Sequence, residues 1–233
     1  MSMVHSQDGI KGKSLVELAG ELEASIREAA REGKSLYEVE KNTWARTLQI
    51  GHAAVEQLLA LQGDGDLGES VVTAEGQGLK RSKELIERPL RTVFGEHTIR
   101  GYVYAPGAHE AIALRPVDAR LSLPPGRCSY FFEEFSQYFC VDQAFGQASR
   151  GLATVLRQEG SVDTLEHINQ RMGGQAEAFL DGLPTPPARE EGALLVFTAD
   201  GKGVPLVKAD AERVAAFDKA ERPGNRRMAT LAA

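Results

Sequence analysis

The spacing of hydrophobic residues predicts two helices at the start of the chain. Within 14–32, apolar residues recur at three- and four-residue steps, which is the period of an amphipathic helix. Ser14 and Glu17 have the spacing of a capping box at the first turn of this helix, and Gly33 follows its last turn. A similar apolar pattern over 35–62 predicts a second helix. We therefore expect residues 1–62 to contain an antiparallel helical hairpin.

The hydrophobic period changes after a polar interval. Residues 63–84 begin with a stretch rich in glycine and acidic residues, which predicts a linker. Apolar positions then alternate, so we expect 85–124 to be a small β module. Its hairpin is expected to turn at Gly95–Glu96, and 111–116 is a candidate third strand.

The helical period returns over 125–183. A face rich in aromatic residues runs from Tyr130 to about Leu156, and we interpret it as core rather than as a platform for stacking bases. Gly160 ends this helix, and Ser161 or Asp163 is the expected cap of the next one. Two helices around a short glycine-containing turn resemble a helix-turn-helix, although any helical hairpin has this pattern.

The last part of the chain predicts a second linker and more strands. Residues 184–192 contain prolines and form the expected linker, and 193–233 follow it. We expect 193–199 and 203–208 to be antiparallel strands on either side of a turn at Gly201–Gly203. A basic turn and another apolar strand follow, and the chain stops inside that strand, which suggests truncation. The predicted fold class is α+β, mainly helical.

Composition narrows the class of protein. The chain has 233 residues, of which 42% are hydrophobic, with no apolar run of the roughly 18 residues that a membrane span requires. Its N-terminus does not resemble a signal peptide. Two cysteines are too few for a secreted disulfide framework. We therefore expect a cytoplasmic protein with reduced thiols and no membrane contact.

The charge distribution argues against a strongly basic surface for nucleic acid. The net charge is −6. Residues 129–199 hold four basic and ten acidic residues, a balance of 4 − 10 = −6. A phosphate-binding surface would therefore have to be local.

Asp200 is the strongest candidate for chemistry, and two interpretations of it stay open. It follows an apolar run that predicts a buried strand, and a carboxylate at a strand end can bind Mg²⁺. Alternatively, Asp200 and Gly201 form only a hairpin turn, for which Asp-Gly is a favoured pair. The five histidines show no HxxxH, HxH or HExxH spacing, so we interpret each as a surface or core residue. The cysteines lack the CxxC spacing of a zinc site.

Three segments together resemble a known family. They are RPVDARLSLPPGRCSYFFEEFSQYFCVDQAFGQA, SVDTLEHINQRMGGQAEAF and FTADGKGVPL with the later RPGNRRMATLAA. In this order they are similar to bacterial insertion-sequence transposases of the DDE kind, in the ISKra-type group. The resemblance extends from about Arg88 to the last residue. Relatives often carry Cys-Pro-x-Cys in the β module, where this chain has Ala105-Pro106-Gly107-Ala108.

The resemblance implies a fold, a reaction and site residues. It implies an RNase H-like catalytic domain that starts within 193–233, with Asp200 as the first of three catalytic acids. In such enzymes these acids hold two Mg²⁺ ions, about 4 Å apart, that act on a DNA phosphate. The later acids of this chain lie too close to Asp200 in sequence to be its partners. We therefore expect an N-terminal portion that is inactive alone.

The partners follow from the same resemblance. They are the DNA ends of the mobile element and other copies of the transposase, in a homo-oligomer. The expected DNA-binding cations are Arg150, Arg157, Arg171, Lys202, Arg226 and Arg227. The alternative function is that of a non-catalytic DNA-binding or interaction protein, either a regulator of transposition or an inert relic.

Overall fold

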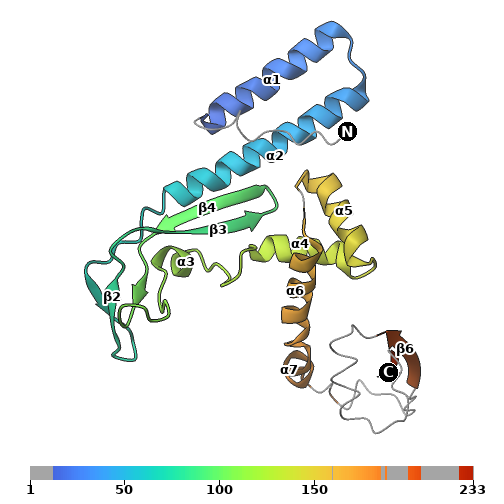
Figure 1. Cartoon of the computed structure of the whole chain (residues 1–233). Helices are drawn as coiled ribbons and strands as arrows, with labels where there is room; N and C mark the ends of the chain where they lie inside the picture. The colour runs from blue at the N-terminus through green and yellow to red at the C-terminus, as the bar shows by residue number, and fades with distance from the viewer. Residues whose placement is uncertain (1–12, 159, 185–186, 188–198, 206–225, 233) are drawn as a thin grey trace. The chain divides into compact units, whose positions relative to one another are not determined.

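The computed structural model describes residues 13–158, 160–184, 187, 199–205 and 226–232, and the chain divides into the units Met1–Ala176 and Glu177–Ala233. The fold is α+β, with helices and small antiparallel sheets, as we predicted (Figure 1). No helix in the described ranges combines the length and the apolar character that crossing a membrane demands.

The helical hairpin at the start of the chain is confirmed. Helix α1 spans Leu15–Glu32 and α2 spans Leu36–Ala60, and Figure 1 shows them side by side. The Ser14 hydroxyl accepts a hydrogen bond from the Glu17 N–H at 3.2 Å, and the Glu17 carboxylate accepts one from the Ser14 N–H at 2.7 Å. This reciprocal capping satisfies two amide groups that the helix leaves unpaired. Gly33 ends α1 in the left-handed conformation, with a φ of 65°.

The prediction of a linker over 63–84 was wrong in part. Strand β1 (Ser70–Val72) pairs with β2 (Gly78–Arg81), and β2 pairs with β5 (Tyr104–Ala105). Leu79 of β2 and Tyr104 of β5 are fully buried, and the Tyr104 hydroxyl hydrogen-bonds to the backbone of 67 and 68. Strand β2 is too short and polar to be predicted from the sequence pattern. It is stabilised by pairing with β5, which is distant in sequence.

The hairpin of the β module turns two residues earlier than we predicted. Strand β3 (Ile86–Thr92) pairs with β4 (Gly95–Gly101), so Val93 and Phe94 form the loop. The Thr92 hydroxyl accepts a hydrogen bond from the Phe94 N–H at 3.1 Å, and Gly95 has a φ of 130°, which disfavours residues with a side chain. Both features place the turn before Gly95. The candidate strand at 111–116 is reduced to one bridge between Leu114 and Tyr104, and α3 (Pro116–Arg120) follows.

The helical region contains a break that the sequence pattern did not reveal. Helix α4 (Tyr130–Cys140) ends before α5 (Phe145–Leu156), and α6 (Val162–Gly173) and α7 (Ala176–Asp181) follow. The break lets α5 fold back on α4, where Gly151 gives space to the Phe139 ring. If α4 and α5 formed one continuous helix, Phe139 and Gly151 could not lie against each other. Ser161 precedes α6 as its N-cap residue, without a side-chain hydrogen bond to the helix.

The main core joins this helical region to the hairpin turn. Its buried members are Val93, Cys128, Phe132, Ala148, Leu152, Leu156, Leu165 and Ile168. The interpretation of the aromatic face as core is confirmed for Leu152, which is buried, and for Phe135, Phe139 and Phe145, which pack against this core. It was wrong for Phe131 and Tyr138, which are exposed, as is Tyr130. A second core of Leu90, Ile99 and Val117 lies between the hairpin and α3.

The second unit contains one antiparallel pair of described strands. Strand β6 (Ala199–Pro205) pairs with β7 (Arg226–Ala232), with Asp200 opposite Leu231. The turn predicted at Gly201–Gly203 was wrong, because these residues lie inside β6 and pair with β7 throughout. Residues 193–198 and 206–208, the rest of the predicted hairpin, lie outside the described residues. The apolar strand expected near the end of the chain is present as β7.

Candidate functional site

The site residues predicted on the second unit lie on its two strands. Asp200 and Lys202 are two residues apart on β6, and Lys202 lies opposite Ala229. Arg226 and Arg227 begin β7, opposite Pro205 and Val204. The backbone therefore brings all four onto one antiparallel pair of strands. Their side chains lie outside the described part of the structure. The predicted exposure of the Asp200 carboxylate therefore stays a prediction.

The three arginines predicted on the helical region have different surroundings. Arg150 and Arg157 are exposed, at the middle and the C-terminal cap of α5, two helical turns apart. Arg171 on α6 forms an ion pair with Glu133 of α4, whose side chain is only 7% exposed. Arg171 therefore already neutralises a buried carboxylate, whereas the exposed guanidinium groups of α5 face solvent.

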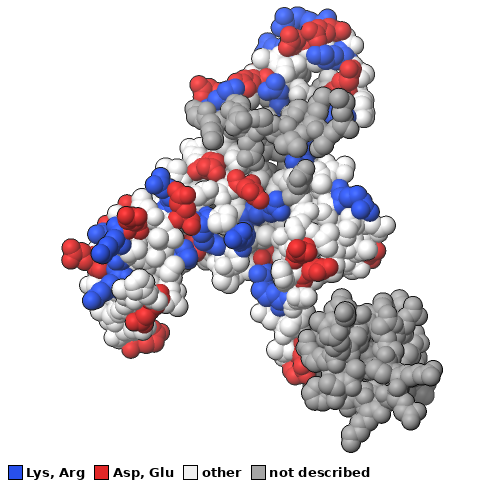
Figure 2. All heavy atoms as spheres, in the orientation of Figure 1, with Lys and Arg blue, Asp and Glu red and all other residues white. Residues whose placement is uncertain are grey.

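A groove between α4 and α6 surrounds this ion pair. It is lined by Tyr130, Tyr138 and Met172 together with the acidic residues Glu133, Glu134 and Asp142. Figure 2 shows acidic and basic side chains interspersed over the visible face of the first unit. The acids of the groove disfavour the binding of a phosphate there.

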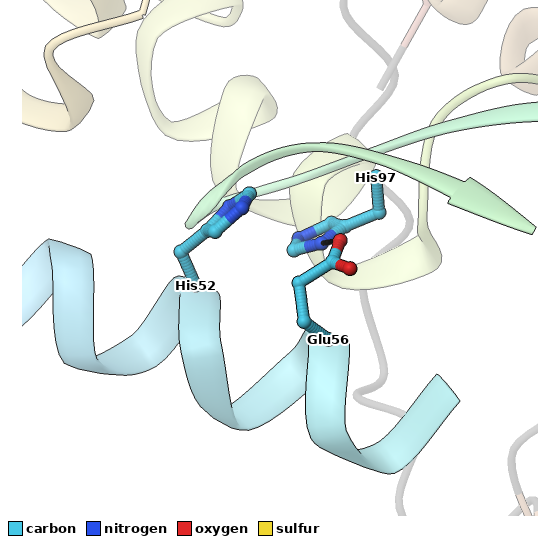
Figure 3. Close-up of side chains that lie close together, drawn as sticks. All are labelled: His52, Glu56 and His97. Carbon is cyan, nitrogen blue, oxygen red and sulfur yellow. Dashed lines mark hydrogen bonds and ion pairs between the residues drawn. The ribbon is translucent and has the colours of Figure 1, made fainter. Parts of the chain in front are cut away.

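A different group of residues in the described part of the chain brings together three side chains that could hold a metal ion. His52 and Glu56 project from the same side of α2, one helical turn apart, and His97 approaches from β4 (Figure 3). One potential ligand atom from each residue lies within 4.8 Å of the other two. We refer to His52, Glu56 and His97 as the His-Glu-His cluster.

Close packing of α2 on the β hairpin creates this cluster. Gly51 lies so close to Phe94 that a Cβ atom at position 51 would overlap the Phe94 ring. The glycine therefore lets the hairpin turn approach the helix backbone beside His52. The two histidine rings stack with their centroids 4.4 Å apart and their planes 18° from parallel.

Hydrogen bonds define which ring nitrogens of the cluster carry protons. His52 Nδ1 lies 3.2 Å from the Phe94 carbonyl oxygen, which can only accept, so Nδ1 is the protonated nitrogen of His52. His97 Nδ1 lies 2.6 Å from Glu56 Oε1, and His97 Nε2 lies 3.0 Å from Thr92 Oγ1. With an ionised Glu56, neutral His97 donates from Nδ1 and accepts at Nε2 from the Thr92 hydroxyl.

Burial controls the charge of His97. Its side chain has no exposed surface, and this burial lowers its pKa below 6.5, against the opposing hydrogen bond from Glu56 and with a smaller contribution from His52. His97 is therefore neutral at neutral pH. A neutral imidazole and a half-exposed carboxylate have lone pairs that can bind a proton or a metal ion.

The sequence reasoning missed this cluster because its members meet only in the folded chain. Glu56 and His97 are 41 residues apart, and we searched for pairs of histidines at short spacing. The one local signal is the i,i+4 pair of His52 and Glu56 on a predicted helix.

Comparisons with known proteins do not assign this chain to a family. Scans against family profiles, curated proteins and solved structures found no match to this chain.

Proposed function

We propose that the chain is the N-terminal portion of a DDE-type transposase, with a DNA-binding first unit and the first strands of an RNase H-like domain in the second. The parent reaction is DNA transposition by metal-dependent strand cleavage and transfer. One observation supports the proposal beyond the sequence resemblance. Asp200 lies on β6 with β7 antiparallel beside it, and an RNase H-like sheet also has its first acid on a strand. The resemblance puts that acid at the end of the strand, whereas β6 continues past Asp200 to Pro205.

Asp200 is the acid that would hold Mg²⁺ in the assembled active site. The reaction uses two metal ions to activate the attacking oxygen and to stabilise the leaving oxygen. One carboxylate cannot hold two ions, and the resemblance assigns a catalytic role to Asp200 alone in this chain. The chain by itself is therefore expected to be inactive. Strand cleavage or transfer by the purified chain with Mg²⁺ or Mn²⁺, abolished by Asp200→Ala, would contradict this assignment.

The DNA that follows the codon for Ala233 tests the family assignment directly. A continuing or frameshifted reading frame that encodes a later Asp and Glu on strand and helix patterns supports the transposase. Unrelated sequence supports the alternative, a non-catalytic DNA-binding regulator or relic.

We propose that DNA binding by the first unit depends mainly on α5. Arg150 in α5 and Arg157 at its C-terminal cap are exposed, whereas Arg171 is paired with the Glu133 carboxylate. Each lost phosphate contact should reduce the slope of log K against log salt by about 0.9. Fluorescence anisotropy with DNA of the element ends should therefore show a weaker and less salt-sensitive complex for the double variant Arg150→Ala, Arg157→Ala.

A matched control separates this effect from a general loss of charge. Arg31 is also exposed but lies on α1, so Arg31→Ala should leave the salt slope unchanged. Equal binding by the double variant and the control would refute the role of α5. The family also implies a homo-oligomer, which sedimentation of the complex with DNA would detect.

A further inference from the structure

We propose that the His-Glu-His cluster is a zinc site that fastens the β3–β4 hairpin to helix α2. The ligands are His52 Nε2, His97 Nδ1 and a carboxylate oxygen of Glu56. This site is independent of the proposed catalytic role of Asp200, which lies in the other unit. Figure 3 shows the three side chains converging between the helix and the strand.

The hydrogen bond of His52 leaves the correct atom for a metal. Because the Phe94 carbonyl accepts from Nδ1, the lone pair of neutral His52 is on Nε2. Histidines that bind metals commonly donate their other ring N–H to a backbone carbonyl in this way, which orients the ring. The His52 tautomer is therefore already the one that zinc requires.

Thr92 provides the corresponding support for His97 through a hydroxyl that can reverse its role. Without metal, the Thr92 hydroxyl donates to His97 Nε2, while Glu56 accepts from Nδ1. With metal on Nδ1, the proton of neutral His97 resides on Nε2 and is donated to Thr92 Oγ1. The Thr92 hydroxyl then donates to the Gly95 carbonyl oxygen, 3.3 Å away. The exchange changes the His97 tautomer and needs no net proton gain or loss on the ring.

The donor set selects the metal. Two imidazole nitrogens and one carboxylate oxygen suit Zn²⁺, which takes four ligands in a tetrahedron. The Glu56 side chain is 50% exposed, so water can reach the fourth position. Tetrahedral zinc places its ligand atoms about 3.3 Å apart. His97 Nδ1 and Glu56 Oε1 are hydrogen-bonded at 2.6 Å and would separate, and each of the three residues has one potential ligand atom within 4.8 Å of the others. Because a ring nitrogen binds a metal in the plane of its ring and the two histidine rings stack 18° from parallel, zinc binding requires His52 to rotate out of the stack. His52 and Glu56 are on the helix surface and can make this movement around a buried, fixed His97.

Zinc titration of the purified full chain after removal of metals tests the site. We expect one Zn²⁺ per chain by calorimetry and a tetrahedral visible spectrum when Co²⁺ replaces it. His52→Phe keeps a stacking ring, and Glu56→Gln keeps an acceptor for His97, but each removes a ligand. Each should weaken Zn²⁺ binding at least tenfold, whereas His167→Ala, at an exposed position on α6, should leave it unchanged. Circular dichroism confirms that each variant is folded.

Nitrogen-15 spectra of the histidine rings provide a readout specific to this geometry. We expect the proton of His97 to move from Nδ1 to Nε2 when Zn²⁺ is added, while that of His52 stays on Nδ1. The proposal is overturned if the chain does not bind Zn²⁺, if the His97 tautomer does not change, or if His52→Phe and Glu56→Gln bind as the wild type does. Loss of binding in His167→Ala would also overturn it.

Discussion

The indole N–H of Trp44 donates a hydrogen bond to the backbone carbonyl of Val155 at 2.8 Å, across 111 residues of sequence. Trp44 lies on α2, and Val155 lies in the last turn of α5, where carbonyl groups have no partner within the helix. The bond thus ties the helical hairpin to the end of α5. Val155 also packs against the main core, so this contact reaches the centre of the first unit.

Trp44→Phe should lower the free energy of unfolding by about 1–2 kcal/mol. The substitution keeps an aromatic ring but removes the donor, and a lost hydrogen bond of this kind costs about 0.5–1.5 kcal/mol, with the smaller ring adding to it. Urea unfolding followed by circular dichroism measures the change. Tyr37→Phe removes a polar atom from an exposed ring on the same helix and should change stability by less than about 0.5 kcal/mol. Equal effects of the two substitutions would contradict a role for the bond.

Gly51→Ala and Gly20→Ala should change stability in opposite directions. Both glycines lie inside helices, where alanine is favoured by about 1 kcal/mol. A Cβ atom at position 20 meets no other atom within 4 Å, whereas one at position 51 overlaps the half-buried Phe94 ring. Overpacking of this kind costs about 1–3 kcal/mol.

We therefore expect Gly20→Ala to stabilise the chain and Gly51→Ala to destabilise it, in the same urea titration. Stabilisation by Gly51→Ala would show that the hairpin turn does not pack against α2 as described. It would also weaken the geometric basis of the His-Glu-His cluster.

The capping box of α1 should contribute to stability in a pH-dependent way. Hydrogen bonds from the Ser14 backbone N–H and then from its side chain lower the pKa of Glu17 below 4.5. Because the folded state favours the ionised form, the contribution is complete above the unfolded pKa and is lost as pH falls through the folded pKa. The difference in stability between the wild type and Glu17→Gln should therefore be largest near neutral pH and should shrink in acid. Thermal unfolding between neutral pH and about pH 3 measures this difference; a constant difference would contradict the effect.

Cys128 should resist alkylation until the chain unfolds. It is buried in the main core, and this burial raises the pKa of its thiol above 9. Cys140 is only partly buried, although burial raises its thiol pKa too. Only a thiolate reacts readily, so mass spectrometry of native protein treated with iodoacetamide near pH 8 should find Cys140 modified first. Rapid labelling of Cys128 in native protein would show that the core around it is open.

Local patterns were sufficient for the elements that local forces stabilise. The apolar period and the spacing of Ser14 and Glu17 predicted α1 and its capping box, because both depend on neighbours within four residues. Gly33 likewise ends the helix through its own backbone freedom. The α+β class followed from the change of period between the helical hairpin and the β module.

Tertiary structure decided what depends on distant partners. Gly201–Gly203 has the composition of a turn, yet it is strand because each of its residues pairs with a residue of β7. Strand β2 forms because it pairs with both β1 and β5. The break after α4 forms because α5 packs back on it. The His-Glu-His cluster requires the approach that Gly51 permits between α2 and the hairpin turn. The physical reason is common to all four: a local pattern determines the conformation that a segment prefers by itself, whereas pairing and burial between distant segments contribute free energies large enough to override that preference.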